Sequence, residues 1–485
     1  GDVGAAAARV FRLDNLGCVR YLPDGTDVEG LGLPRDGQAL AALVGPALSA
    51  VPADVPAPTV RSVAQPARRV GRAPASTGFR VVPLGDGPSV WLRRDPAVPV
   101  VSALLTVPGG SLTETARDAG LSTLVRMVQV KGAAGRDAQA LHEDLEGQGA
   151  SISPTAQRDH AGLALHALSD RLDDALDLLE LVIVAPDFPE AEVEQERRLA
   201  LQQLASLEDS PFQAAALRLR ELMYGDHPYG RPLSGTATSL PGLDRAALAA
   251  RHVADWTRGA PQVVVSGDFD EDRLLARLGQ LFAALPPGAA PAVPPVGPAR
   301  RPDGIEQLRL QRRQNQTVVL AGWPGPIDPD EQRIPLMLLR ELLNGQSGRL
   351  FEALRNRRSL CYNSGLLSTA GFGQGMLMGY VLTAPETAAE AAAALAREVA
   401  DLTDAPVGDV EFARARSRLL GGLLIGVQGN AAQAARASRS FLYGRSPGDL
   451  EEVVAGVETC TPADVRDAAA AFITPEARFE VVLGP

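Results

Sequence analysis

The sequence is poor in cysteine, histidine and aromatic residues. Its three cysteines, Cys18, Cys361 and Cys460, lie far apart and form no metal-binding or redox motif, so no disulfide framework is implied. No stretch reaches the 18 or more consecutive apolar residues that a membrane helix needs. We expect a soluble protein, cytoplasmic or periplasmic, with no membrane partner. Since the chain begins at Gly1 and not at methionine, we expect any targeting signal to lie upstream.

Basic residues are also in deficit. The chain has 47 of them against 58 acidic residues, which gives a net charge of −11 at pH 7. An acidic surface repels a phosphate backbone, so we expect no nucleic acid partner. Apolar residues make up 45% and charged residues 22%, a globular composition that excludes disordered and fibrous classes. With 485 residues, two to four domains are expected.

Two proline-rich stretches, residues 51–75 and 286–302, lack apolar periodicity and are typical of linkers. Each of the two blocks that follow these linkers has the same expected order of elements: a strand, helices, strands, helices and a strand. In the first block we expect strands within residues 89–107, 150–157 and 162–168 and in QVVVSGDFD, with helices over 119–130, 136–146, 169–184 and 188–208.

The second block repeats the first. A shift of 213 positions carries four residues onto identical types: Gly132, Gly135, Arg136 and Leu141 become Gly345, Gly348, Arg349 and Leu354. Residues 5–23 likewise resemble residues 468–485, so the chain is expected to begin inside the last helix of an earlier copy. Another polypeptide would then complete the orphaned strand, and a purely local N-terminal strand is the alternative. The expected organisation is a helix-strand remnant (1–24), a linker (25–75), a first domain (76–287), a linker (288–302) and a second domain (303–485).

Several motifs together resemble the insulinase/pitrilysin family of zinc peptidases, the inverzincins, over residues 76–485. They are GGS at residues 109–111, GLSTLVRMVQVKG, HPYGRPLSGT at residues 227–236, the SGD turn at residues 266–268, and LNGQSGRLFEALRNRRSLCY. The resemblance implies an α+β fold with two homologous insulinase-like domains, each a mainly antiparallel sheet packed with helices.

The zinc motif of that family is degenerate here. Active members carry H-x-x-E-H on a helix, where two histidines bind zinc and the glutamate acts as general base. The matching positions are Thr123, Arg126 and Met127, none of which can serve. The glutamate pair that supplies the third ligand is replaced by Gln202 and Gln203. The five histidines include no i,i+4 pair, so we expect no metal and no cofactor in this chain.

One further element of the family is retained. In these peptidases an Arg and a Tyr seven residues apart reach across a cavity from the second domain and contact the substrate, and Arg355 and Tyr362 match that spacing. Their physical role would be to donate hydrogen bonds to a carbonyl oxygen that gains negative charge. Judged by residue type alone, an arginine in a helix rich in charged residues most often lies on a solvated face. A tyrosine at the start of a strand is most often half-buried in the packing. Weaker peptide-contact candidates, for which a structural use is favoured, are Gly109, Gly110, Asn344 and Gln346.

The resemblance favours a catalytically incomplete subunit of a heterodimeric zinc metallopeptidase. A homologous partner carrying H-x-x-E-H, possibly the upstream half of the same precursor, would hold the zinc, and both halves would enclose a chamber for peptides. Two alternatives stay open: a scaffold subunit without catalysis, and a homodimeric peptide-binding protein.

Overall fold

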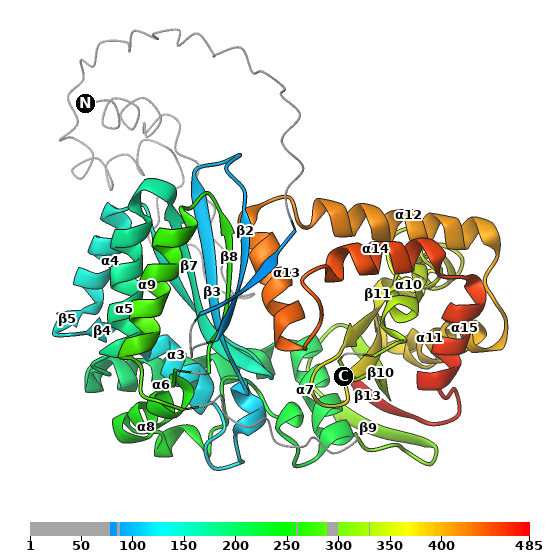
Figure 1. Ribbon diagram of the computed structural model, residues 1–485. Coiled ribbons are helices and arrows are strands. Elements are labelled where there is room, and N and C mark those ends of the chain that lie inside the picture. Colours follow the sequence, from blue (N-terminus) through cyan, green and yellow to red (C-terminus); the bar gives the residue numbers. More distant parts are fainter. Residues whose placement is uncertain (1–77, 85–87, 259, 289–298, 329) are drawn as a thin grey trace, which may run out of the picture. The chain divides into compact units, whose positions relative to one another are not determined.

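The computed structural model describes residues 78–84, 88–258, 260–288, 299–328 and 330–485. The expected remnant at 1–24 and linker at 25–75 lie outside these residues, as does most of the expected linker at 288–302. Among the described residues, no helix combines the length and apolarity needed to cross a membrane. The described residues form one two-stranded sheet and two large sheets, and the two large sheets share the same chain order over five strands. Figure 1 shows the two large sheets.

The first sheet has six strands in the order β1-β2-β8-β3-β7-β6. β2 and β8 pair in parallel, and all the other neighbours are antiparallel. The two expected strands within residues 89–107 are β2 and β3, but β8 lies between them, so they do not form a hairpin. The strand bounds are β1 (Arg80–Pro83), β2 (Ser89–Arg94), β3 (Val100–Pro108), β6 (Ser151–Ala156), β7 (His160–Leu168) and β8 (Gln262–Gly267).

The second sheet has five strands in the order β11-β12-β10-β13-β9. It also has one parallel pair, β9 with β13, and is otherwise antiparallel. The expected fold of two homologous, mainly antiparallel α+β domains is therefore confirmed. The strand bounds are β9 (Ile305–Gln311), β10 (Thr317–Pro324), β11 (Cys361–Thr369), β12 (Met376–Thr383) and β13 (Arg478–Gly484).

One face of each sheet is covered by helices from its own half. Alternate residues of β3, such as Val101 and Leu105, are buried against α4, α5 and α9, and Val319 of β10 is buried against α10, α11 and α15. Figure 1 shows the first set of helices side by side on the first sheet. Their bounds are α4 (Ala138–Gly147), α5 (Leu172–Val184), α9 (Glu271–Ala284), α10 (Arg333–Leu343), α11 (Ala388–Asp404) and α15 (Pro462–Phe472).

The other face of each sheet is covered by a helix from the opposite half. α13 (Asn430–Leu442) packs on β3 and β8 of the first sheet, where the rings of Trp91 and Phe441 stack at 4.7 Å (Figure 1). α7 (Pro211–Tyr224) packs on β10 and β13 of the second sheet, with Leu219 and Met223 fully buried. This exchange buries all four sheet faces and fixes the two halves to each other.

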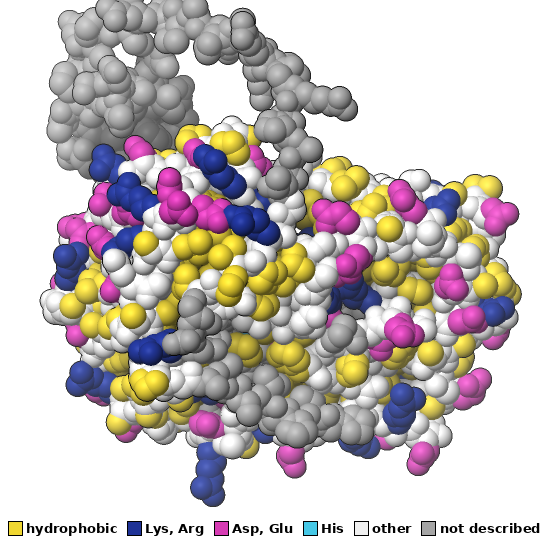
Figure 2. All heavy atoms as spheres, in the orientation of Figure 1, with side chains coloured by type: hydrophobic (Ala, Val, Ile, Leu, Met, Phe, Trp, Pro, Cys, Tyr) yellow, Lys and Arg dark blue, Asp and Glu magenta, His cyan; other side chains and the backbone are white. Residues whose placement is uncertain are grey.

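A third helical group lies beside the first sheet. α3 (Leu121–Gln129) packs against α6 (Glu190–Asp209) and α8 (Arg245–Asp255) through a small apolar cluster. Other elements include the two-residue strands β4 (Gly132–Ala133) and β5 (Arg136–Asp137), the helices α12 (Asp409–Ile425) and α14 (Asp449–Thr459), and the π-helical turn η6 (Phe351–Asn356). Figure 2 shows acidic and basic side chains mixed over the face in view, so the described residues form no continuous basic patch there.

Candidate functional site

Arg355 and Tyr362 lie together at the open edge of the second sheet. η6 supplies Arg355, and the edge strand β11 supplies Tyr362. Arg355 Nη1 donates to the carbonyl oxygen of Tyr362 at 3.0 Å, and the guanidinium carbon lies 5.0 Å from the centre of the tyrosine ring. The spacing of seven residues therefore brings the two side chains into direct contact.

A β-bulge exposes the tyrosine. Cys361 pairs with Thr383 and Asn363 pairs with Leu382, so Tyr362 is the extra residue between two successive pairs. A bulge bends a strand locally and re-aims a side chain. Tyr362 is 74% exposed, a high value for an aromatic residue.

The amide of Asn344 is used within the chain. Its Nδ2 donates to the carbonyl oxygen of Leu366 at 2.8 Å, and its Oδ1 accepts from the Leu366 backbone N–H at 2.7 Å. Because β11 is an edge strand, this amide satisfies backbone groups that β12 does not reach. Asn344 thus closes part of the sheet edge, and Gln346 lies exposed in the turn that follows α10.

Gly109 and Gly110 are buried and shape a turn. The Gly109 N–H donates to the Asp159 carbonyl oxygen at 2.7 Å, and Gly110 has a φ of 50°. A Cβ on Gly110 would lie 2.3 Å from the carbonyl oxygen of Gln157, so no larger residue fits. The GGS motif therefore lets the end of β3 approach the β6–β7 hairpin closely.

The positions that the sequence analysis matched to the zinc motif lie on α3 and α6. Thr123 Oγ1 donates to the Leu233 carbonyl oxygen at 2.7 Å, and Met127 is half-buried one turn later. Gln202 and Gln203 are exposed on α6. The described part of the chain holds no group of three or more His, Cys, Asp or Glu side chains that could bind a metal ion.

Arg126, which the sequence analysis matched to the general base, belongs to a buried ionic cluster. Its guanidinium donates to Asp255 and to Gln129 and lies 5.2 Å from the centre of the Trp256 ring. Arg251 Nε donates to the other oxygen of Asp255 at 2.7 Å. Burial lowers the pKa of Arg126, and the charge of Asp255 opposes that shift. The sequence analysis did not identify Asp255, because no local pattern near Arg126 indicates a partner 129 residues away.

A second buried carboxylate joins the two halves. Asp159, in the β6–β7 turn, is 4% exposed and accepts hydrogen bonds from the hydroxyls of Tyr229 and Tyr443 and from the Phe372 N–H. Burial and this negative charge raise the pKa of both tyrosines above their usual range. Tyr229 belongs to the HPYG motif, so that motif and GGS meet at one turn. The sequence alone gave no signal for Asp159 or Tyr443.

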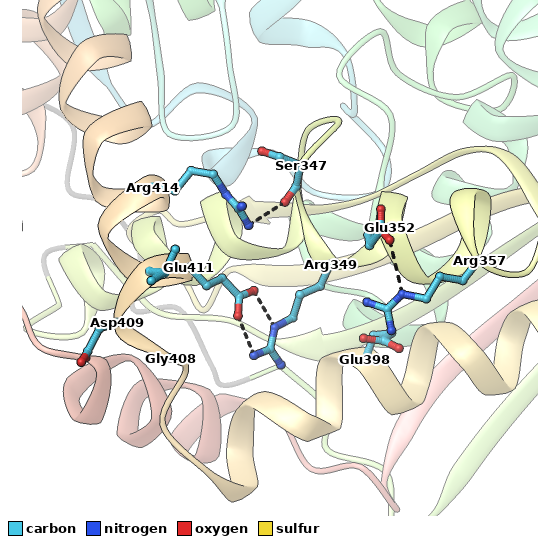
Figure 3. Close-up of a pocket in the computed structure, with 10 residues that line it drawn as sticks. Ser347, Arg349, Glu352, Arg357, Glu398, Gly408, Asp409, Glu411 and Arg414 are labelled. Atoms are coloured by element: carbon cyan, nitrogen blue, oxygen red, sulfur yellow. Dashed lines mark hydrogen bonds and ion pairs between the residues drawn. The ribbon is translucent and has the colours of Figure 1, made fainter.

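A charged hollow of about 700 Å³ lies beside η6, between α11 and α12 (Figure 3). Arg349 bonds Glu411 with two hydrogen bonds of 2.8 and 3.0 Å, and the bond to Glu411 raises the pKa of Arg349. Arg357 pairs with Glu352 at 3.4 Å in the same hollow. Arg349, one of the repeated residues, therefore fastens η6 to α12.

Comparisons with known proteins agree with this architecture. The family described as insulinase (peptidase family M16) matches residues 89–237, and the peptidase M16 inactive domain matches residues 255–419. An uncharacterised zinc protease of Mycobacterium tuberculosis is 28% identical over 421 residues, covering 85% of this chain and 96% of its own. Another, YmxG of Bacillus subtilis, is 21% identical and covers 76% of this chain and 89% of its own.

Solved structures share the fold. A peptidase M16 inactive domain from Pseudomonas fluorescens has a TM-score of 0.79 at 23% identity and covers 84% of this chain and 98% of its own. A protease from Helicobacter pylori has a TM-score of 0.76 at 16% identity, covering 84% of this chain and 99% of its own. With the two matching domains, the repeated sheet order and the shared motifs all in agreement, this chain belongs to the insulinase family of peptidases, family M16.

Proposed function

We propose that this chain is a catalytically incomplete subunit of a two-part zinc peptidase. A homologous partner with an intact H-x-x-E-H motif would hold the zinc. This chain would supply Arg355 and Tyr362 to the partner's site and half of the wall around a peptide-degrading chamber. Its own α3 does not fit a zinc ion, because Thr123 and Met127 are poor ligands and the base position carries a buried cation.

The chemistry of the pair supports this role. Attack on a peptide bond builds negative charge on the carbonyl oxygen, and donors already in place at that oxygen lower the barrier. The guanidinium of Arg355 and the phenol of Tyr362 are two such donors, and charge-assisted hydrogen bonds are among the strong ones. Their contact within one chain keeps the two side chains next to each other.

One observation carries the proposal. Tyr362 is 74% exposed on a bulged edge strand and is held by an arginine that forms no ion pair among the described residues. A tyrosine and an arginine that served only the fold would be expected to pack or to pair with an acid. Here both polar ends stay available for a second molecule.

The test starts from the full chain purified from its native host with any companion. Zinc content and peptide hydrolysis are measured for the complex and for each part. We expect no stoichiometric zinc and no turnover from this chain alone, and one zinc in the companion. Within the complex, Arg355→Ala and Tyr362→Phe should each lower kcat by about 10²- to 10³-fold without preventing assembly. Arg358→Ala, an exposed neighbour in the same segment, is the matched control.

Three outcomes would contradict the proposal. Zinc bound by this chain alone would overturn the ligand argument. Unchanged turnover in both the Arg355 and the Tyr362 variants would leave a scaffold subunit. A chain that has no companion, associates with itself and binds peptides without cleaving them would be the homodimeric peptide-binding protein.

A further inference from the structure

Arg355 differs from Arg349 and Arg357, two arginines near η6, in what holds it. Arg349 is bonded by Glu411, and Arg357 pairs with Glu352 (Figure 3). Among the described residues, Arg355 pairs with no carboxylate, and its guanidinium donates one hydrogen bond, to the backbone of Tyr362. Its guanidinium instead lies against aromatic rings.

Two rings flank this guanidinium. Its central carbon is 5.1 Å from the centre of the Phe351 ring and 5.0 Å from the centre of the Tyr362 ring. Both rings are therefore close enough for a cation–π interaction with the same guanidinium. Phe351 is half-buried at the first position of η6, four residues before Arg355, and the buried Leu354 anchors the turn between them.

We propose that Phe351 is a positioning residue for Arg355. It holds the guanidinium plane through its ring face and leaves the N–H donors free for a substrate carbonyl. This inference rests on the proposed function of the Arg355 and Tyr362 pair and adds the group that orients it.

The choice of an aromatic neighbour has a chemical reason. A carboxylate would also fix an arginine, but it would occupy the N–H donors and compete with the substrate oxygen. A ring attracts the cation through its face and uses none of the donors. Arg355 has five N–H donors, and the recorded contact with Tyr362 uses one of them. A guanidinium held by rings is thus fixed in place and still able to donate.

The test uses the assembled peptidase and a fluorogenic peptide that the wild-type complex cleaves. Phe351→Leu keeps an apolar side chain but removes the ring face, and we expect kcat to fall roughly tenfold because Arg355 loses its alignment. Phe351→Tyr keeps the ring face and should retain the wild-type kcat. In an Arg355→Ala background, Phe351→Leu should cause no further loss, since Phe351 acts only through Arg355. Crystal structures of the isolated chain should show the Arg355 guanidinium displaced from the Tyr362 ring in Phe351→Leu and in place in Phe351→Tyr.

Two results would overturn the assignment. One is an equal loss from Phe351→Leu with and without Arg355, which would give Phe351 a role in the fold alone. The other is a guanidinium that stays against Tyr362 in the Phe351→Leu crystal structure. That second measurement needs no partner. If Arg355→Ala left turnover unchanged, the proposed function would fail, and the crystal structure would still decide what Phe351 does.

Discussion

Replacing Arg126 by methionine should destabilise the first half of the chain. Arg126 is fully buried, and the Asp255 side chain is 2% exposed, so Arg126→Met leaves a carboxylate inside the protein with only Arg251 beside it. Removing one partner of a buried ion pair costs about 3–5 kcal/mol. Because Arg251 still reaches one oxygen of Asp255, we expect the lower end, about 3 kcal/mol of unfolding free energy. Arg126→Glu should cost more, since two carboxylates would then meet away from water.

Urea unfolding followed by tryptophan fluorescence measures this change, and Trp256 reports on the site because its ring lies against Arg126. Arg136→Met is the matched control: its partner Asp144 is 45% exposed, so the loss should stay below about 1 kcal/mol. Adding Asp255→Asn to Arg126→Met should restore part of the lost stability by removing the buried negative charge, although Arg251 then loses its ion pair. An unfolding midpoint unchanged in Arg126→Met would refute the reasoning, because the buried pair would then be unnecessary to the fold.

Three further predictions test other parts of the structure. Burial lowers the pKa of His252 from 6.5 to about 4. Between pH 6.5 and pH 4 the unfolded chain therefore protonates this histidine while the folded chain does not. The free energy of unfolding should fall by up to about 1.4 kcal/mol per pH unit as the pH drops through this range. His252→Gln should flatten that part of the pH dependence of the urea midpoint, whereas His142→Gln, at an exposed position, should not. Gly110→Ala should lower the thermal unfolding midpoint far more than Gly135→Ala. Both glycines have a positive φ, but only a Cβ on Gly110 would collide with backbone atoms. Equal losses in the two variants would show that this collision is not the cause. Asp159→Asn should cost about 2 kcal/mol and speed proteolysis of the loop at residues 371–374, and an unchanged digestion pattern would contradict its role in joining the halves.

The sequence predicted the regular elements well, because their apolar spacing is local. The expected helices at 119–130 and 188–208 are α3 and α6, which end within two residues of those bounds. The shift of 213 residues carries Ala138, the first residue of α4, onto Phe351, the first residue of η6. Periodicity and turn residues were sufficient for this level of structure.

The contacts that define the candidate site depend on long-range packing and could not be read in the same way. The sequence analysis predicted that Arg126 cannot act as a base, but it could not predict the salt bridge to Asp255, which exists only because α8 packs against α3. The bulge at Tyr362 depends on the pairing of β11 with β12. Asn344 was a weak candidate for peptide contact, and its amide instead completes the edge of β11, which no local pattern indicates.

Because α7 and α13 each cover the sheet of the opposite half, the stability of each half depends on the other. If the chain were cut between the sheets, each fragment would keep a helix whose apolar face no longer packs on a sheet. Each fragment would also keep a sheet with one face exposed to water. Neither fragment would be a viable domain, and each would be prone to aggregate or to recapture the other.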